Sequence, residues 1–314
     1  MSHSARFPST AAVAALLLIS TLGFSSCRAA DAPGPDTFQA ELDAWKAGRS
    51  ERLHSPTGWL TLIGLDWLQE GDNLVGSAPD AVVKLPADRA PAKAAHLTLA
   101  GGKVTFMAEP QVAFTVDGKP AAGTVELRSD EHAGEPSMVA LGSVSFYIIS
   151  RNDRLAVRVK DSQSPKLTGF TGIESFPADP SWRVNARFEP YPPGKTLQVP
   201  TILGTVDTMA EPGAVVFERD GKTYRLDTVL EEGETDLFII FGDLTNRHET
   251  YGGGRFLYAK PADAKGVVML DFNRSYNPPC VFTPYATCPL PPPGNKLSLR
   301  VEAGEKMYGK QHDS

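Results

Sequence analysis

Short runs of β-forming residues, separated by tight-turn residues, constrain the fold of this chain more than any other feature. From residue 81 onward such runs follow one another closely, and no helix of ordinary length is needed after residue 70. Pairs that favour hairpin turns stand between them at Gly101-Gly102, Asp117-Gly118 and Asp220-Gly221. Many short strands with turns between them predict a mainly β protein with an antiparallel, sandwich-like or barrel-like fold.

The runs fall into two series, which predict two β lobes packed as one unit over residues 37–310. The first lobe covers about 56–160 and the second about 182–310. Before them, Phe38, Leu42 and Trp45 recur at helical spacing and predict one short N-terminal helix, preceded by a Pro/Gly linker at 31–36. A chain of 314 residues with 41% hydrophobic residues has room for one large core or two smaller ones.

Residues 1–30 have the pattern of a signal peptide. Arg6 supplies a positive charge, and the apolar run at 11–24 is too short for a standard membrane span. The run ends in a degenerate lipobox, so we favour lipidation of Cys27 and a membrane tether. Cleavage a few residues later, which would release a soluble protein, is the alternative. Either outcome predicts an exported protein, periplasmic or anchored to a membrane as a lipoprotein.

The segment 271–293 is dense in proline, with seven prolines from Pro278 to Pro293. Proline presets φ and removes a backbone donor, which excludes a helix or a central strand and predicts a stiff, extended loop. Cys280 and Cys288 lie within it, separated by seven residues. In an oxidising compartment they would most simply form a disulfide. A zinc site is the rival, although neither a C-x-x-C pair nor a histidine at ligand spacing accompanies them.

The glycine run Gly252–Gly254, between Tyr251 and Arg255, is the second unusual feature. Three glycines let backbone N–H groups converge on an anion, or let another chain segment approach closely. The planar guanidinium of Arg255 suits a carboxylate or a phosphate. The alternative is a bulge at the start of a strand, with Arg255 paired to Asp243 or Asp271.

Several function classes are disfavoured by what the sequence lacks. The net charge of −6 and the absence of a basic run give no argument for nucleic acid. The chain contains no G-x-S-x-G, H-E-x-x-H, P-loop or Rossmann pattern, so we predict neither a cofactor nor a bound metal. An enzyme whose residues converge from distant strands remains open.

The leading hypothesis is an exported cell-envelope protein that binds a small polar or anionic ligand at a site built from 250–255 and 271–288. The predicted ligand-binding residues are Tyr251, Gly252, Gly253, Gly254, Arg255, Asn273, Arg274, Tyr276 and Asn277. One alternative is a hydrolase or lyase with Asp271 or Asp243 as general base on the same face. Another is a structural or interaction protein without a pocket, in which the proline-rich loop is a clasp.

The blocks TYGGGRFL, LDFNRSYNPPC and CPLPPPGNKL resemble the C-terminal signature of an uncharacterised bacterial and archaeal family called domain of unknown function 1684. GWLTLIGLDWLQEGDNLVGS and SFPADPSWRV look like its other shared blocks, so the resemblance covers about residues 40 to 307. The family has no agreed activity, and the resemblance therefore implies no catalytic residues. Its signature includes the matching Tyr251, Gly252, Gly253, Gly254, Arg255, Asp271, Asn273, Tyr276, Asn277, Cys280 and Cys288.

Overall fold

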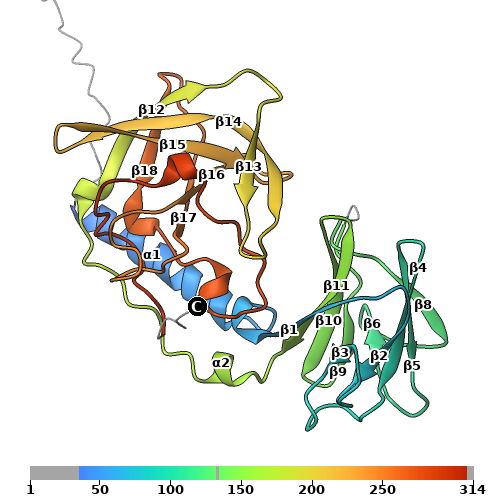
Figure 1. Ribbon diagram of the computed structural model, residues 1–314. Helices are drawn as coiled ribbons and strands as arrows, with labels where there is room; N and C mark the ends of the chain where they lie inside the picture. Colours follow the sequence, from blue (N-terminus) through green and yellow to red (C-terminus); the bar gives the residue numbers. More distant parts are fainter. Residues whose placement is uncertain (1–34, 132–133, 310–314) are drawn as a thin grey trace, which may run out of the picture. The chain divides into compact units, whose positions relative to one another are not determined.

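The computed structural model describes residues 35–131 and 134–309 (Figure 1). The expected signal peptide, Cys27 and residues 31–34 of the expected linker lie outside the described residues. The described chain consists mainly of antiparallel strands, with one long helix at its N-terminal end. The predicted fold class is confirmed.

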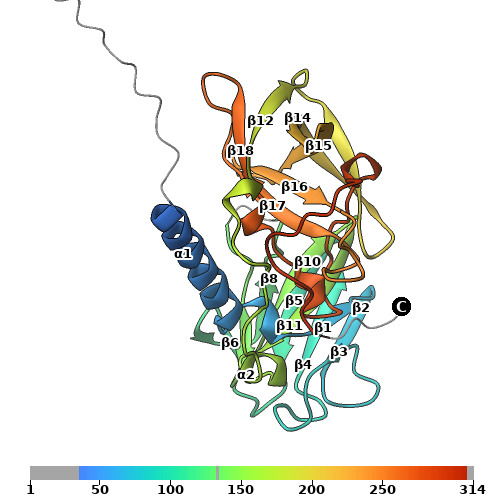
Figure 2. The same ribbon diagram turned by 90° about the vertical axis from the view of Figure 1, so that its left-hand side faces the viewer.

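Helix α1 spans Pro35–His54 and is longer than the short helix that the sequence predicted. It begins inside the expected linker, because proline fits the first turn of a helix, where its missing N–H is not needed. Phe38, Leu42 and Leu53 are its buried apolar residues. Figure 2 shows α1 running beside the C-terminal strands, where Arg49 forms an ion pair with Glu305 at 3.0 Å.

Two sheets use only strands from the first half of the chain. The six-stranded sheet has the order β1-β11-β10-β9-β6-β7, and the five-stranded sheet has the order β3-β2-β4-β5-β8. Their apolar faces share one core, in which the rings of Phe106, Phe114 and Phe146 pack edge to face. The strands are β1 (Leu62–Trp67), β2 (Gly71–Gly76), β3 (Val83–Lys84), β4 (Ala95–Ala100), β5 (Lys103–Ala108), β6 (Thr115–Val116), β7 (Lys119–Pro120), β8 (Thr124–Leu127), β9 (Val139–Leu141), β10 (Val144–Arg151) and β11 (Arg154–Asp161).

The third sheet uses only strands from the second half. Its order is β17-β16-β15-β14-β12-β18, with β13 paired to β14. A separate core lies on it, in which the Phe272 ring contacts those of Trp182, Phe217 and Phe241. The strands are β12 (Arg183–Pro190), β13 (Thr196–Pro200), β14 (Val206–Arg219), β15 (Lys222–Leu230), β16 (Leu237–Phe241), β17 (Arg255–Ala259) and β18 (Val267–Asp271).

The predicted hairpin turns join antiparallel neighbours. Gly101-Gly102 connects β4 to β5, Asp117-Gly118 connects β6 to β7, and Asp220-Gly221 connects β14 to β15. All six residues have positive φ, the conformation that these turns need and that glycine adopts without strain.

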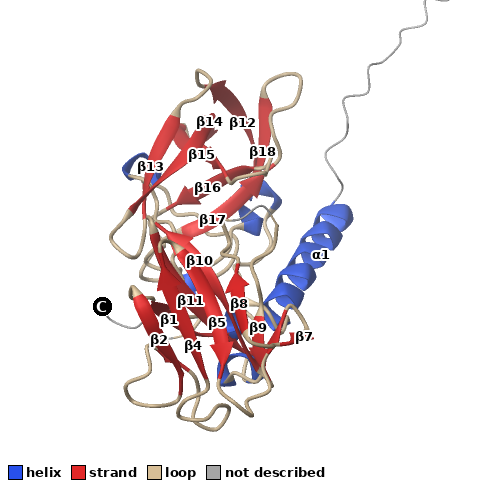
Figure 3. Cartoon of the chain, turned by 90° about the vertical axis from the view of Figure 1, so that its right-hand side faces the viewer, coloured by secondary structure: helices blue, strands red, loops and turns tan. Residues whose placement is uncertain are grey.

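The remaining helical elements are single turns. They are η1 (Trp59–Thr61), α2 (Pro165–Thr168), η2 (Pro180–Trp182), η3 (Phe272–Arg274), η4 (Pro279–Val281) and η5 (Pro293–Asn295). As its prolines require, the segment after β18 contains only such turns, bridges and loops (Figure 3). Within the described ranges, we find no helix long and apolar enough to span a membrane.

Candidate functional site

The glycine run and the proline-rich segment lie side by side. Phe256, which follows the glycine run by two residues, forms an isolated antiparallel bridge with Tyr276. The backbone bonds run both ways, from Phe256 N–H to Tyr276 O at 3.0 Å and from Tyr276 N–H to Phe256 O at 2.9 Å. The two segments that the sequence singled out therefore meet in space.

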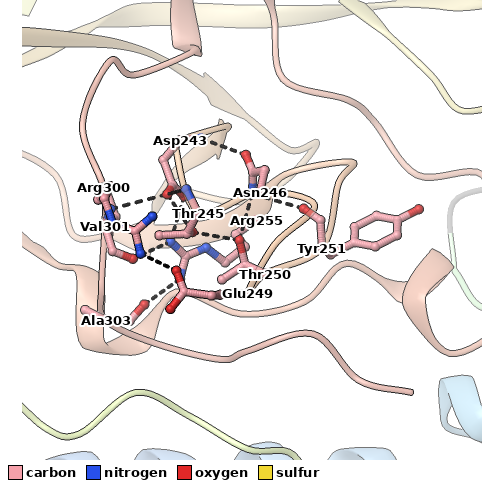
Figure 4. A network of polar contacts seen from close by, with 10 residues as sticks. All are labelled: Asp243, Thr245, Asn246, Glu249, Thr250, Tyr251, Arg255, Arg300, Val301 and Ala303. Carbon is pink, nitrogen blue, oxygen red and sulfur yellow. Dashed lines mark hydrogen bonds and ion pairs between the residues drawn. The ribbon is translucent and has the colours of Figure 1, made fainter. Parts of the chain in front are cut away.

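Arg255, however, points into the protein and is 0% exposed. Its Nη2 lies 2.7 Å from Asp243 Oδ2 and 2.8 Å from the Val301 carbonyl oxygen, and its Nη1 donates to the Ala303 carbonyl (Figure 4). Burial lowers the pKa of this guanidinium, and the charge of Asp243 opposes that shift. This arrangement corrects the expectation that Arg255 binds a ligand, because both of its Nη atoms bond within the fold and its Nε, which has no partner in the described chain, is buried. The pairing with Asp243 is the alternative that the sequence left open.

The glycine run serves close packing. Gly254 has φ +88°, and a Cβ there would lie 2.4 Å from Pro291 Cγ and 2.6 Å from the Phe241 carbonyl oxygen. A Cβ on Gly253 would lie 2.5 Å from the Tyr251 ring. That ring points away from Arg255 (Figure 4), and burial, followed by the neighbouring Cys280 thiol, raises the pKa of the phenol. The close approach of other segments explains Gly253 and Gly254 without an anion.

Both candidate general bases are engaged in the fold. Asp243 accepts from Thr245 N–H at 2.8 Å and Thr245 Oγ1 at 2.6 Å, in addition to Arg255. Asp271 accepts from Asn273 N–H at 3.2 Å and Arg183 Nε at 3.2 Å. Either carboxylate would have to leave an ion pair to accept a proton from a substrate.

Three more predicted ligand-binding residues also bond within the chain. Asn273 exchanges two hydrogen bonds with the backbone of Asp179, at 2.9 and 3.0 Å. The Asn277 amide donates to the Lys306 carbonyl at 2.7 Å. Arg274 lies 3.4 Å from Asp271 and 3.7 Å from Glu41. It lines a hollow of about 710 Å³ in which its charge, Arg183 and Lys260 face Glu41, Asp236, Asp263 and Asp271. That hollow offers no excess positive charge for an anion.

A larger cavity of about 810 Å³, which we call the Arg158 cavity, lies beside the predicted site. Tyr276 is the predicted ligand-binding residue that reaches it. Four arginines line this cavity, whereas Glu231 is the single carboxylate among its described lining residues. The lining residues are Trp45, Arg49, Arg52, Leu53, Ser55, Thr57, Gly58, Trp59, Arg151, Arg158, Glu231, Phe238, Phe256, Tyr258, Tyr276, Pro279, Thr287, Cys288 and Pro289.

One wall of the Arg158 cavity is aromatic. Phe238 on β16 stacks on Tyr258 of β17, with ring centroids 4.8 Å apart and planes 17° apart, and Tyr258 stacks on Tyr276 at 6.2 Å and 14°. We call these three rings the aromatic ladder. Burial raises the pKa of Tyr258 and of Tyr276, so both phenols stay protonated at neutral pH. The Tyr258 hydroxyl donates to Glu231.

Two of the four arginines in the cavity are neutralised by neighbours. Arg151 forms an ion pair with Asp130 at 2.8 Å. Arg49 pairs with Glu305, and its guanidinium lies 4.7 Å from the centre of the Tyr276 ring. Arg52 is exposed, in the last turn of α1.

Arg158 differs from the other three. It is 5% exposed, and within the described residues it forms no ion pair with a carboxylate. Its Nη1 donates to the Tyr147 hydroxyl at 3.2 Å and its Nη2 to Thr287 Oγ1 at 3.4 Å, while its Nε has no partner within the described chain. The Trp59 ring centre lies 5.2 Å from the guanidinium carbon. Burying a charge without an opposite charge is unfavourable, so this arrangement indicates room for an anion.

Lys160 adds a second cation on the same face of β11, two residues from Arg158. Its Nζ donates to the Thr57 carbonyl at 2.5 Å and lies 5.2 Å from the centre of the Tyr147 ring. Burial, and then the nearby charge of Arg158, lower the pKa of Lys160 to about 8. Arg158 and Lys160 therefore place two positive charges next to each other on one face of β11.

The two cysteines lie next to each other as free thiols, so the structure contains no disulfide between them. The Cys280 N–H donates to Cys288 Sγ at 3.1 Å. The hydrogen bond from Cys288 lowers the pKa of the Cys280 thiol, and the same contact raises that of Cys288. In the described parts of the chain, no group of three or more His, Cys, Asp or Glu side chains could hold a metal ion.

Comparison with known proteins gives a family match within the C-terminal part of the chain. Residues 168–306 match the family model described as "Protein of unknown function (DUF1684)". The resemblance recognised in the sequence is confirmed over this segment. The DUF1684 segment contains the aromatic ladder, whereas Arg158 and α1 precede it.

Among solved structures, an uncharacterised protein of Haloarcula marismortui is similar to the chain, with 28% identity and a TM-score of 0.38 over 45% of this chain and 79% of that one. The FhaA FHA domain, complexed with the intracellular domain of Rv3910, matches with 16% identity and a TM-score of 0.21, over 31% of this chain and 97% of that one. No curated protein matches.

Proposed function

We propose that this protein binds a small anionic ligand in the Arg158 cavity. The observation that carries the proposal is Arg158 itself, a buried guanidinium at a cavity wall with no carboxylate partner within the described chain. A carboxylate or phosphate in the cavity would supply the missing opposite charge, and charge-assisted hydrogen bonds are about twice as strong as neutral ones.

The remaining charges of the cavity support this proposal. Arg49 and Arg151 each have a carboxylate partner, and Glu231 accepts from a tyrosine hydroxyl. A bound anion would therefore meet Arg158 without competition from an internal carboxylate in the described part of the chain.

The alternatives fit these contacts less well. A hydrolase or lyase with Asp243 or Asp271 as base would have to break an ion pair. A purely structural protein would not need a cavity of about 810 Å³ with an uncompensated arginine. We therefore favour ligand binding over catalysis, at a site that keeps Tyr276 from the sequence-based prediction and replaces Arg255 with Arg158.

Our proposal includes export. The pattern of residues 1–30 favours a periplasmic protein or a lipoprotein tethered through Cys27. Mass analysis of the mature N-terminus tests this, because an acylated Cys27 and a cleaved soluble N-terminus have different masses. In that compartment we expect Cys280 and Cys288 to oxidise to a disulfide, which a mass 2 Da below the reduced form would reveal.

The proposed function is tested by calorimetric titration with benzoate and inorganic phosphate, with neutral benzamide as the uncharged comparison. We expect saturable binding of at least one anion by the wild type and an affinity about tenfold to a hundredfold lower in Arg158→Met. Arg154→Met is the matched control, because Arg154 lies on the same strand but stacks on Trp67 and does not line the cavity. Equal anion binding by Arg158→Met and the wild type would contradict the proposal.

A further inference from the structure

Building on the proposed function, we infer that the ligand of the Arg158 cavity is an amphipathic anion. Its charged head binds Arg158, and its flat apolar body, preferably an aromatic ring system, lies against the aromatic ladder of Phe238, Tyr258 and Tyr276. The inference rests on the different chemistry of the two walls of this cavity.

The volume of the cavity indicates that the ligand has an apolar body in addition to its charged head. About 810 Å³ lies within the roughly 300–1,000 Å³ typical of small-molecule sites. An inorganic phosphate or an acetate would leave much of it to water. Only a molecule larger than phosphate or acetate would therefore fill the space beyond Arg158.

The aromatic ladder specifies what that body is like. Its rings are nearly parallel, with interplanar angles of 17° and 14°, and Tyr258 stacks on both of the others. A further ring can therefore meet Tyr258 at its edge, in the edge-to-face arrangement that aromatic pairs also favour. Tyr258 is 38% exposed, which leaves part of a large apolar ring accessible. Its hydroxyl is already bonded to Glu231, so contact with the ladder is mainly apolar.

Arg158 supplies a cationic group to the lining of the same cavity. Lys160, which does not line the cavity, projects from the same face of β11, and the charged groups of Arg158 and Lys160 lie 6.0 and 5.2 Å from the centre of the Tyr147 ring. Arg49 covers the Tyr276 ring at 4.7 Å, so this end of the ladder is already occupied by a cation. A ligand with a charge at one end and a ring at the other satisfies both walls at once.

The test compares three probes by isothermal titration calorimetry: 2-naphthoate, acetate and 2-naphthamide. They separate the head from the body, because acetate lacks the ring system and 2-naphthamide lacks the charge. We expect 2-naphthoate to bind at least about tenfold more tightly than either of the others.

Two variants test whether the aromatic ladder binds the ring system of 2-naphthoate. We expect Tyr258→Leu to weaken 2-naphthoate binding about tenfold and to leave acetate binding unchanged, since the substitution removes a ring but no charge. Tyr258→Phe keeps the ring and should retain binding. Because Tyr258 is an exposed position on β17, both variants should fold, which circular dichroism can verify.

The outcomes separate this inference from the proposed function. Equal affinity for acetate and 2-naphthoate, with both lost in Arg158→Met, would overturn the amphipathic ligand and leave anion binding standing. Equal affinity for 2-naphthamide and 2-naphthoate, unaffected by Arg158→Met, would overturn both. Failure of all three probes to bind the wild type would also overturn both.

Discussion

Two buried arginines in different parts of the molecule have opposite surroundings. Arg255, the first residue of β17, is 0% exposed and bonds Asp243 and two backbone carbonyls. Arg158, in the middle of β11, is 5% exposed and bonds only two hydroxyl groups within the described chain. The first guanidinium has an internal counter-charge, and the second has none among the described residues.

The difference shows that burial alone does not give a charged residue its role. A buried arginine with an internal counter-charge holds segments together, and removal of one partner leaves an uncompensated charge. A buried arginine without a counter-charge lowers stability, and natural proteins tolerate such losses where function requires them. This contrast supports a structural role for Arg255 and a ligand-binding role for Arg158.

The largest expected effect tests the structural side of this comparison. Arg255→Met should lower the free energy of unfolding by about 3–5 kcal/mol, because Asp243 would be left as a buried charge without its partner. Urea denaturation measures this loss. The double variant Asp243→Asn/Arg255→Met should lose clearly less than the sum of the two single variants. A loss below about 1 kcal/mol for Arg255→Met would contradict the role assigned to this pair.

The second prediction concerns the segment that connects the two regions. Cys280 bonds Tyr251 near the Arg255 network, and Cys288 lines the Arg158 cavity. Oxidation of this pair should raise the free energy of unfolding by about 2–3 kcal/mol, because it closes a short loop in the unfolded chain. Denaturation of diamide-treated and reduced protein measures the difference. The Cys280→Ser/Cys288→Ser variant should show no redox dependence, and an unchanged stability after oxidation of the wild type would contradict the prediction.

The third prediction concerns Arg158, whose substitution should change the free energy of unfolding in the opposite direction to that of Arg255. Arg158→Met should raise the free energy of unfolding of the ligand-free protein by about 1 kcal/mol, because it removes a buried donor without a partner and keeps much of the apolar side chain. The measurement is the same urea denaturation. A loss comparable to that of Arg255→Met would show that Arg158 is also a structural residue.

The smallest expected effect is a dependence on pH. The pKa of Lys160 is about 8 in the folded protein, against 10.5 for an unperturbed lysine. Between these values the unfolded chain binds more protons, so the contribution of Lys160 to stability rises with pH. The Lys160→Met variant should therefore gain most over the wild type near pH 7, and this advantage should shrink by about pH 9.5. Denaturation at the two pH values gives the difference, and an advantage that does not change with pH would contradict the prediction.

Local patterns explain why much of the fold could be predicted. Gly101-Gly102 and Asp220-Gly221 require positive φ wherever they occur, so the hairpins around them follow from the residues alone. The bridge between Phe256 and Tyr276 also fits the expected meeting of the glycine run and the proline-rich segment. The length of α1 was underestimated, because Leu53 becomes buried only through contacts made elsewhere in the fold.

The site was harder to predict because its chemistry depends on partners far away in the chain. The backbone carbonyl groups that accept hydrogen bonds from Arg255 belong to Val301 and Ala303, about fifty residues later in the chain. The Arg158 cavity brings together residues from α1, β11 and β17. One signal was present: Arg158 and Lys160 alternate with Val157 and Val159, which puts the two cations on one face of a strand whose other face is buried. Nothing local shows that this cationic face is also covered.

The most direct test of the account is the affinity for benzoate of the wild type, Arg158→Met and the control Arg154→Met, measured by calorimetric titration under identical conditions. We predict one saturable site in the wild type and in Arg154→Met, with affinity about tenfold to a hundredfold lower in Arg158→Met, which is the loss expected for a charge-assisted hydrogen bond. Equal affinity in all three proteins would contradict the claim that Arg158 holds an anion.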